Sequence, residues 1–159
     1  MVQVDDAIVA KLAASGFTAR QSSQTEPTLI VGVASAGTAL TGQQLAGLAA
    51  AQESIVELSL QRTGIGDAQL ADVARLASLV RLRLDNNRLS DAGVGALKSL
   101  PKLQYLNLYG NAGVTDRSIE TLAALKALRH VYLWRTGISP AGAARLQQVR
   151  PDLDINMGD

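Results

Sequence analysis

QYLNLYGNAGV, at positions 104–114, is the stretch that decides the fold, because its outline occurs four times in the chain. The defining residues of this copy are Leu103, Leu106, Leu108 and Asn111. The matching residues of the other copies are Ile55, Leu58, Leu60 and Thr63, then Leu79, Leu82, Leu84 and Asn87, and finally Leu128, Val131, Leu133 and Thr136. The first residues of successive copies are 24, 24 and 25 positions apart, which indicates one repeated structural unit.

Each copy is predicted to form a strand followed by a helix. Its apolar residues first alternate, as in a strand with one buried face, and then recur at helical spacing. A column of helix-capping residues has the same period and consists of Thr41, Gly66, Ser90, Thr115 and Ser139. Four of these five carry a hydroxyl that can accept a hydrogen bond from the free amides at a helix start. Residues suited to the first helical turn follow the caps of the four regular copies, namely Asp67, Asp91, Asp116 and Pro140.

Apolar residues behind each cap are predicted to face the sheet and complete the core. They are Leu70, Val73 and Leu76; Val94, Leu97 and Leu100; Ile119, Leu122 and Leu125; and Ala143, Leu146 and Val149. A well-buried Leu contributes about 1.5 to 3 kcal/mol, but one strand and one helix cannot cover their apolar side without a neighbouring unit. The units are therefore expected to be stable only as a stack.

The two ends of the chain depart from the repeat. Residues 4–15 are predicted to form a helix that ends at Gly16, and 18–28 a polar connecting loop, so that 1–28 make an N-terminal helical cap and loop. A degenerate copy begins with a strand at 29–33 and continues with a helix whose inward residues are Leu45 and Leu48. Leu153 and Ile155 indicate a last, truncated strand, which places the solenoid at 29–155 and a C-terminal tail at 156–159.

At these residues the chain resembles the leucine-rich repeat family, whose unit is L-x-x-L-x-L-x-x-N-x-L. Residues 79–89, LVRLRLDNNRL, satisfy every position, and 103–114 do so with one inserted residue. Thr63 and Thr136 stand where Asn is usual, which leaves a hydroxyl in place of a carboxamide. The resemblance covers roughly 29–155 and implies an α/β solenoid of about five strand-helix turns. Its parallel sheet would form the concave face, and its helices the convex face.

A narrower resemblance is carried by LSDAGVGAL at 89–97, GVTDRSIETL at 113–122 and VYLWRTGISPAGAARLQQ at 131–148. These segments are similar to a bacterial group with 24-residue units, which is often appended to larger exported proteins, some with a cytochrome c-type haem domain. The resemblance implies a binding or scaffolding module without catalysis and favours a periplasmic or extracellular location. The haem attachment motif needs cysteine, and the chain has none.

Composition excludes several classes of function. The chain of 159 residues has a net charge of +1, so no overall field attracts it to nucleic acid or to an acidic membrane. No apolar run approaches the ~18 residues of a membrane helix, and the acidic start MVQVDDAIV is unlike a secretory signal. The absence of cysteine excludes disulfides, thiolate metal sites and cysteine nucleophiles within this chain. We expect a monomer without a cofactor.

The predicted register places polar and aromatic residues on the concave face, between the inward leucines. All three Tyr and the single Trp fall there, in the last two regular copies. The predicted partner-binding residues are Tyr105, Asn107, Tyr109, His130, Tyr132 and Trp134, bordered by Arg81, Arg83, Asp85 and Arg135. Tyr, Trp and Arg dominate many interfaces, because they bury large areas and keep a polar group. The leading hypothesis is therefore a protein partner.

Three alternatives to a protein partner stay open. The aromatic residues could bind carbohydrate by stacking on sugar rings, or they could only stabilise the sheet through cross-strand contacts. The solenoid could also be a structural spacer in a larger exported protein. Glu57 with Arg81, and Arg83 with Asp85, are expected to form exposed ion pairs. His130 is the only histidine, and no ligand set or nucleophile at a suitable spacing predicts a metal site or an enzyme.

Overall fold

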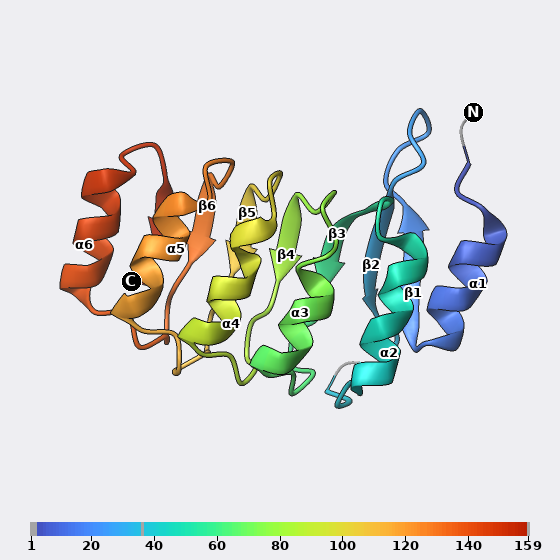
Figure 1. The fold of residues 1–159 in the computed structure, drawn as a ribbon, viewed down its shortest axis with the longest axis horizontal. Coiled ribbons are helices and arrows are strands. Elements are labelled where there is room, and N and C mark those ends of the chain that lie inside the picture. The colour runs from blue at the N-terminus through green and yellow to red at the C-terminus, as the bar shows by residue number, and fades with distance from the viewer. Residues whose placement is uncertain (1–2, 36, 159) are drawn as a thin grey trace.

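Seven strands form one sheet and follow each other in chain order. The structure is a computed structural model that describes residues 3–35 and 37–158. The strands are β1 (Phe17–Gln21), β2 (Leu29–Val33), β3 (Ile55–Ser59), β4 (Arg81–Arg83), β5 (Tyr105–Asn107), β6 (His130–Tyr132) and β7 (Asp154–Asn156). Strands β2 to β7 are parallel, and β1 pairs with β2 antiparallel. Figure 1 shows these strands in a row behind the helices.

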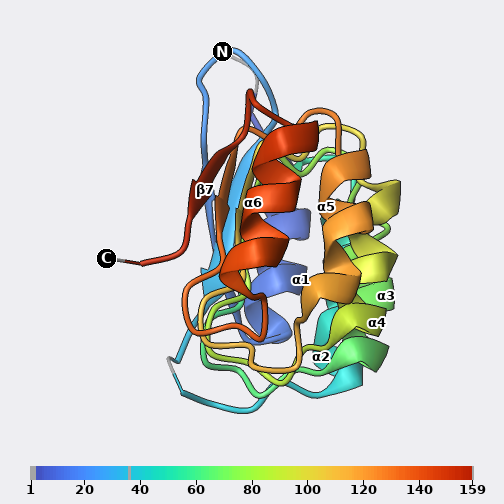
Figure 2. The ribbon, with the colours of Figure 1, turned by 90° about the vertical axis from the view of Figure 1, so that its left-hand side faces the viewer.

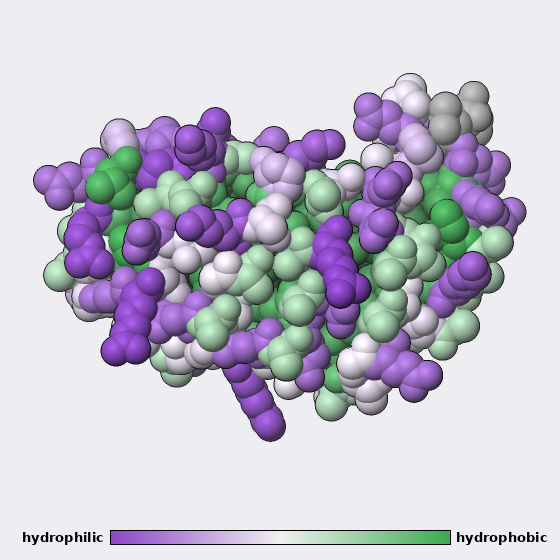
Figure 3. Space-filling model, viewed as in Figure 1, coloured by the Kyte–Doolittle hydropathy of each residue, from purple (hydrophilic) through white to green (hydrophobic). Residues whose placement is uncertain are grey.

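The helices cover a single face of the sheet, as Figure 2 shows end-on. The α-helices are α1 (Asp6–Ala14), α2 (Gly42–Ala46), α3 (Leu70–Val73), α4 (Asp91–Ala96), α5 (Ile119–Ala124) and α6 (Pro140–Val149). Short 3-10 helices extend them: η1 (Gly47–Ala51), η2 (Asp67–Gln69), η3 (Leu97–Ser99) and η4 (Asp116–Ser118). Hydrophilic side chains are spread over this face, with only small hydrophobic patches (Figure 3). Five strand-helix turns follow, from β2–α2 to β6–α6, which confirms the predicted α/β leucine-rich repeat solenoid.

The core lies between the sheet and the helices and runs the length of the solenoid. Every leucine, isoleucine and valine that the strand pattern assigns to the core of the four regular copies is at most 2% exposed. The predicted inward residues of the helices are also buried, except one. Val149 is 57% exposed, so its assignment to the core was wrong. It ends α6, the last helix, and no further described helix packs beside it.

The N-terminal region corrects one prediction. Asp5 caps helix α1, because its carboxylate accepts a hydrogen bond from the amide of Ala7, and Gly16 lies just beyond the helix with φ +87°. The segment 18–28 was predicted to be a loop, but its first part belongs to β1, which pairs along its whole length with β2. Only Phe17 of β1 is fully buried, so the strand carries little of the apolar alternation that marks the later copies.

Asparagine side chains join successive copies at the turn after each strand. Asn111 is fully buried, and its Nδ2 donates to the carbonyls of Leu108 in its own copy and Leu84 in the preceding one, both at 3.0 Å. Its Oδ1 accepts from the amide of Leu89 at 3.1 Å. Asn87 likewise donates to carbonyls of two copies. These carboxamides satisfy turn groups that would otherwise be buried without a partner.

The threonines that replace asparagine make fewer of these bonds, as expected from a single hydroxyl. Thr63 Oγ1 donates to the carbonyl of Leu60 at 2.7 Å, and Thr136 Oγ1 donates to that of Leu133 at 2.6 Å. Both bonds lie within one copy. The amide and Oγ1 of Thr63 also donate to Asn87 Oδ1 of the next copy, at 3.0 and 3.3 Å. The threonine hydroxyls thus close their own turns without a bond to the copy before, whereas the asparagine side chains bind that copy as well.

A second set of contacts between copies involves the aspartates of the first helical turn. Asp91 accepts hydrogen bonds from the amide and hydroxyl of Thr115, the capping residue of the next copy, at 2.8 and 2.6 Å, and also from the hydroxyl of Ser118. Asp67 binds Ser90 in the same way, and Asp116 binds Ser139. We call this set the aspartate ladder. Each aspartate thus links the starts of two neighbouring helices.

The aspartate ladder also lowers the pKa values of two of its carboxyl groups. Burial raises the pKa of Asp91, but hydrogen bonds from Ser118 and Thr115 outweigh this effect and bring the pKa below its ordinary value. The hydroxyl and amide of Ser139 lower the pKa of Asp116 in the same direction. Both carboxylates are therefore stabilised in their charged form by the folded state.

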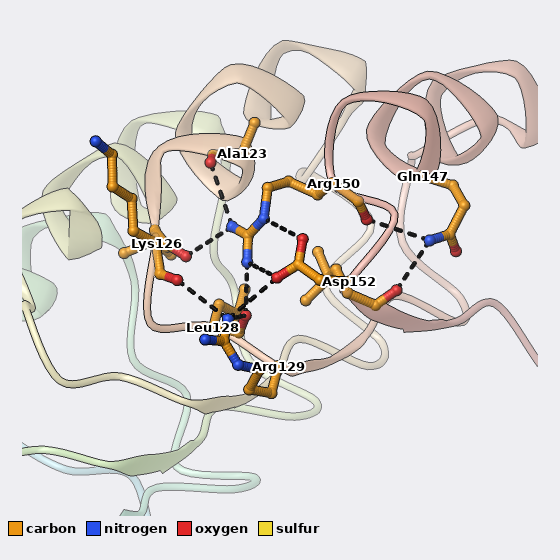
Figure 4. Close-up of polar contacts among 9 residues, drawn as sticks. Ala123, Lys126, Leu128, Arg129, Gln147, Arg150 and Asp152 are labelled. Carbon is orange, nitrogen blue, oxygen red and sulfur yellow. Dashed lines mark hydrogen bonds and ion pairs between the residues drawn. The ribbon is translucent and has the colours of Figure 1, made fainter.

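Arg150 closes the C-terminal end of the solenoid (Figure 4). Its guanidinium donates to the carbonyls of Ala123, Leu125 and Leu128 at 2.8 to 3.3 Å and forms two bonds to the carboxylate of Asp152. Ala123 and Leu125 belong to the last turn of α5, whose final carbonyls lack partners within the helix. The Arg150 hydrogen bond is the main cause that lowers the pKa of Asp152 to about 2.

Candidate functional site

The face of the sheet turned away from the helices, here called the concave face, carries the predicted site residues in regular columns. Glu57, Arg81, Tyr105, His130 and Asp154 lie side by side on neighbouring strands. A second column consists of Ser59, Arg83, Asn107, Tyr132 and Asn156. The register that the repeat predicts is confirmed at each position of β3 to β6, and Asp154 and Asn156 extend the two columns onto β7.

Aromatic side chains pair across β5 and β6. The rings of Tyr105 and Tyr132 have centroids 5.3 Å apart and planes tilted by 46°. Those of Tyr109 and Trp134, just beyond the two strands, are 5.2 Å apart and tilted by 41°. Such tilted contacts contribute about 0.5 to 1.5 kcal/mol each beyond the area that they bury. Trp134 is nevertheless 44% exposed, so the pair leaves a large aromatic surface open to solvent.

Arginines border these rings, as the sequence predicts. The Arg81 guanidinium lies 4.2 Å from the centroid of Tyr105, and the Arg135 guanidinium lies 5.3 Å from that of Trp134. Burial, with a smaller contribution from Tyr132, raises the pKa of Tyr105. Arg81 also approaches Glu57 at 3.9 Å. This ion pair is long and largely exposed, so it contributes little to stability.

Arg83 and Asp85 form the second predicted ion pair, with Arg83 Nε 3.4 Å from Asp85 Oδ1. The Asp85 side chain is only 9% exposed, and its Oδ1 has no hydrogen bond within the described residues. The contact to Arg83 is therefore an attraction between charges without the alignment of a hydrogen bond. The structure thus places one incompletely satisfied carboxylate beside the aromatic residues.

The C-terminal segment packs against the aromatic residues, which the sequence did not predict. A Cβ atom added to Gly158 would lie 2.3 to 2.5 Å from Cδ1, Cγ and Nε1 of Trp134. Gly158 has φ +79°, a conformation that glycine adopts without strain. The position of Gly158, 24 residues after Trp134, is the sequence signal that could have revealed this contact.

His130 has one acidic neighbour, because its Nδ1 lies 3.0 Å from Oδ2 of Asp154. Both side chains are more than half exposed. Within the residues that the structure describes, no group of three or more His, Cys, Asp or Glu side chains is placed to hold a metal ion. His130 and Asp154 therefore form a solvent-exposed polar pair across β6 and β7.

The ten predicted site residues therefore form one surface, which we call the concave patch. It consists of Arg81, Arg83, Asp85, Tyr105, Asn107, Tyr109, His130, Tyr132, Trp134 and Arg135. Sequence reasoning missed Gly158 and the acidic end of the first column at Asp154. The described helices also include none that is long and apolar enough to cross a membrane.

Comparisons with known proteins point to one family. Residues 77–138, which contain β4 to β6, match a family model described as Leucine rich repeat. Acidic leucine-rich nuclear phosphoprotein 32 family member A of Drosophila melanogaster is 37% identical over 73 residues, which is 46% of this chain and 26% of that protein. Asporin of Bos taurus is 30% identical over 89 residues, which is 56% of this chain and 24% of that protein. The chain thus spans about a quarter of the length of the curated relatives it matches.

A solved structure supports the fold independently. The tropomodulin C-terminal domain of Caenorhabditis elegans covers 91% of this chain with a TM-score of 0.61, and 92% of that domain is matched. The two sequences are only 15% identical, so the likeness concerns the fold alone. The narrower resemblance to bacterial 24-residue units, and its association with exported cytochrome proteins, stays a prediction.

Proposed function

We propose that this chain, which is a leucine-rich repeat protein, is a non-catalytic module that binds a protein partner through its concave patch. Leucine-rich repeat proteins generally mediate interactions between proteins. One feature of the chain supports this role: its open sheet face is rich in Tyr, Trp and Arg, the residue types that dominate interfaces.

The observation that carries the proposal is the pairing of four aromatic rings on one exposed surface. Tyr105 with Tyr132, and Tyr109 with Trp134, hold each other in place across β5 and β6. Each ring is thereby fixed before a partner arrives, which reduces the side-chain entropy lost on binding. Sheet stabilisation alone does not require the 44% exposure of Trp134. The rings therefore form a prepared surface rather than a buried cluster.

A protein partner suits this surface better than a carbohydrate does. A sugar ring stacks on a free aromatic face, but guanidinium groups of Arg81 and Arg135 lie over Tyr105 and Trp134. Gly158 lies against the Trp134 ring as well. Stacked arginines together with tilted aromatic residues are typical of the central contacts of protein interfaces.

The test is a triple substitution, Tyr105→Ala, Tyr132→Ala and Trp134→Ala. Both variant and unchanged protein are immobilised, and proteins captured from an extract of the source organism are identified and then purified for direct titration. We expect the variant to lose at least about 2 kcal/mol of binding free energy, because these positions have the character of interface hot spots. Circular dichroism checks that the variant is folded, since it loses two ring contacts of about 0.5 to 1.5 kcal/mol each.

A matched control changes three exposed residues of α6 on the opposite face, Arg145→Ala, Gln148→Ala and Val149→Ala. This control should bind like the unchanged protein. Equal affinity of the folded concave variant and the unchanged protein would refute the proposal and favour a spacer role. A response to glycans that disappears in the concave variant would instead favour carbohydrate binding.

A further inference from the structure

A hollow of about 500 Å³ lies outside the concave patch, at the edge where β3 and β4 end. Its lining includes Arg62 and Gly64 from the turn after β3, Asn86 and Arg88 from the turn after β4, and Ala39 from the segment before α2. In Figure 1 these turns lie along the lower edge of the molecule. Three separate segments of the chain thus line a single, open hollow with two arginines in its wall.

Arg62 and Arg88 differ from Arg81 and Arg83 of the concave patch, because no carboxylate of the described residues forms an ion pair with them. Arg62 and Arg88 are exposed, and neither has a carboxylate within 4.0 Å in the ranges 3–35 and 37–158. No acidic residue lines the hollow. The hollow therefore concentrates two positive charges in a chain whose net charge is only +1.

Hydrogen bonds between copies hold the backbone of the hollow. The amide of Arg62 donates to the carbonyl of Asp85 at 3.1 Å, and that of Arg88 donates to Ile65 at 3.0 Å. The amide of Asn86 donates to Tyr109 at 2.7 Å. Because these turns are fixed to one another, the starting points of the arginine and asparagine side chains are fixed as well. Such preorganisation favours binding of a small ligand.

Arg62 occupies a backbone conformation that glycine would adopt more easily. Its φ is +54°, and Asn86 at the same position of the next copy has φ +55°. The third copy places Gly110 there with φ +76°, so the fold accepts glycine in this turn. A non-glycine residue in this region costs of the order of 1 kcal/mol. The fourth copy places Arg135 there with φ +54°, and its guanidinium lies over Trp134. The turn gains no backbone stability from arginine at either position, so what Arg62 contributes lies in its side chain.

We propose that this hollow binds a phosphate-type oxyanion through the guanidinium groups of Arg62 and Arg88. A planar guanidinium presents two parallel N–H donors that match the oxygens of a phosphate group. The Asn86 carboxamide, which makes no hydrogen bond within the described residues, supplies a further donor at the wall. The group can be free phosphate or the end of a phosphomonoester, because both present the same oxygens. This site adjoins the concave patch through the backbone of Asp85 and Tyr109, but no side chain of the patch lines it, and it does not depend on the proposed function.

The test titrates the isotopically labelled chain with inorganic phosphate, and separately with phosphoserine, at constant ionic strength. Nuclear magnetic resonance follows the backbone amides. We expect saturable shifts centred on Gly64, Asn86 and Arg88. Arg88→Gln should weaken binding by about ten-fold or more, because it removes charge-assisted hydrogen bonds. Preference for phosphate over phosphoserine would identify the free ion as ligand, and the reverse would identify a monoester.

Arg62→Gly is the decisive variant, because it separates binding from folding. It should weaken phosphate binding by about ten-fold or more while raising the melting temperature, since it relieves the positive φ. Arg75→Gln, an exposed arginine of the helical side, removes the same charge outside the hollow and should leave binding unchanged. Shifts that do not saturate, or that weaken equally in Arg75→Gln and Arg88→Gln, would overturn the proposal.

Discussion

Asp91 provides the sharpest test of how the copies are held together. Its carboxylate accepts hydrogen bonds from the amide and hydroxyl of Thr115 and from the hydroxyl of Ser118. Ser118 is only 1% exposed, so its hydroxyl cannot turn to water when Asp91 is removed. Asp91→Ala therefore loses three bonds and leaves at least one buried donor unsatisfied.

The size of this effect follows from the number and type of bonds. A hydrogen bond to a charged group contributes about 1.5 to 3 kcal/mol, so three would give about 4.5 kcal/mol at the lower limit. Asp91 is partly exposed, and one carboxylate serves all three donors, so the contributions are not additive. We expect Asp91→Ala to lower the free energy of unfolding by about 3 kcal/mol, measured by urea denaturation.

Asp72→Ala is the control, because Asp72 lies in α3 and makes no side-chain hydrogen bond or ion pair within the described residues. It should change the stability by no more than about 0.5 kcal/mol. If the free energy of unfolding of Asp91→Ala lies within about 1 kcal/mol of that of Asp72→Ala, the reasoning that the aspartate ladder joins the copies is refuted.

The pH dependence of the stability is a second test of the hydrogen bonds to Asp91. The folded state lowers the pKa of Asp91, so its charge contributes stability above the pKa of the unfolded chain, near 3.8. This contribution is lost as the pH falls through the lower, folded pKa. The difference in stability between the unchanged protein and Asp91→Asn should therefore be constant near neutral pH and shrink below about pH 4.

Two further predictions concern the other contacts. Asn111→Thr should keep the bond to the carbonyl of Leu108, as Thr136 does in its copy, but lose those to Leu84 and Leu89; urea denaturation should show a loss of about 2 kcal/mol. Arg150→Met should lose three carbonyl contacts and the pair with Asp152 and lower the melting temperature clearly. Arg129→Met loses a half-exposed pair with Asp152 and two carbonyl contacts of 3.2 Å, so it should lower the melting temperature less than Arg150→Met does.

The repeat explains why most of the architecture could be predicted from the sequence. A residue such as Leu106 has the same environment as Leu82 and Val131, so each copy checks the assignment of the others. The same reasoning placed Tyr105 beside His130 and Arg81 without any knowledge of side-chain contacts. Whether these residues bind a partner is a different question, because adjacency on a sheet does not distinguish an interface from a stabilising cluster.

Features that the repeat does not contain were missed. Strand β1 has one fully buried residue, Phe17, so its own apolar pattern does not predict a strand. It forms because it pairs with the edge of β2. Val149 matches an inward position, but the repeat cannot indicate that no described helix follows α6. Predicting the aspartate ladder requires the distance between the starts of two neighbouring helices. The sequence shows only that Asp91 is suited to a first helical turn.

The position of the concave patch in the stack bears on its proposed role. The patch occupies the last complete copies, where a solenoid has one neighbour fewer to restrain it and would be expected to fray. Here Arg150 binds the end of α5 and the turn before β6, while Gly158 lies against Trp134. These contacts fix β6 and its aromatic residues from the side on which no further described copy packs. A binding surface held in this way loses less entropy on association than one at a mobile end, so the restraints of this end agree with the proposed role of the concave patch.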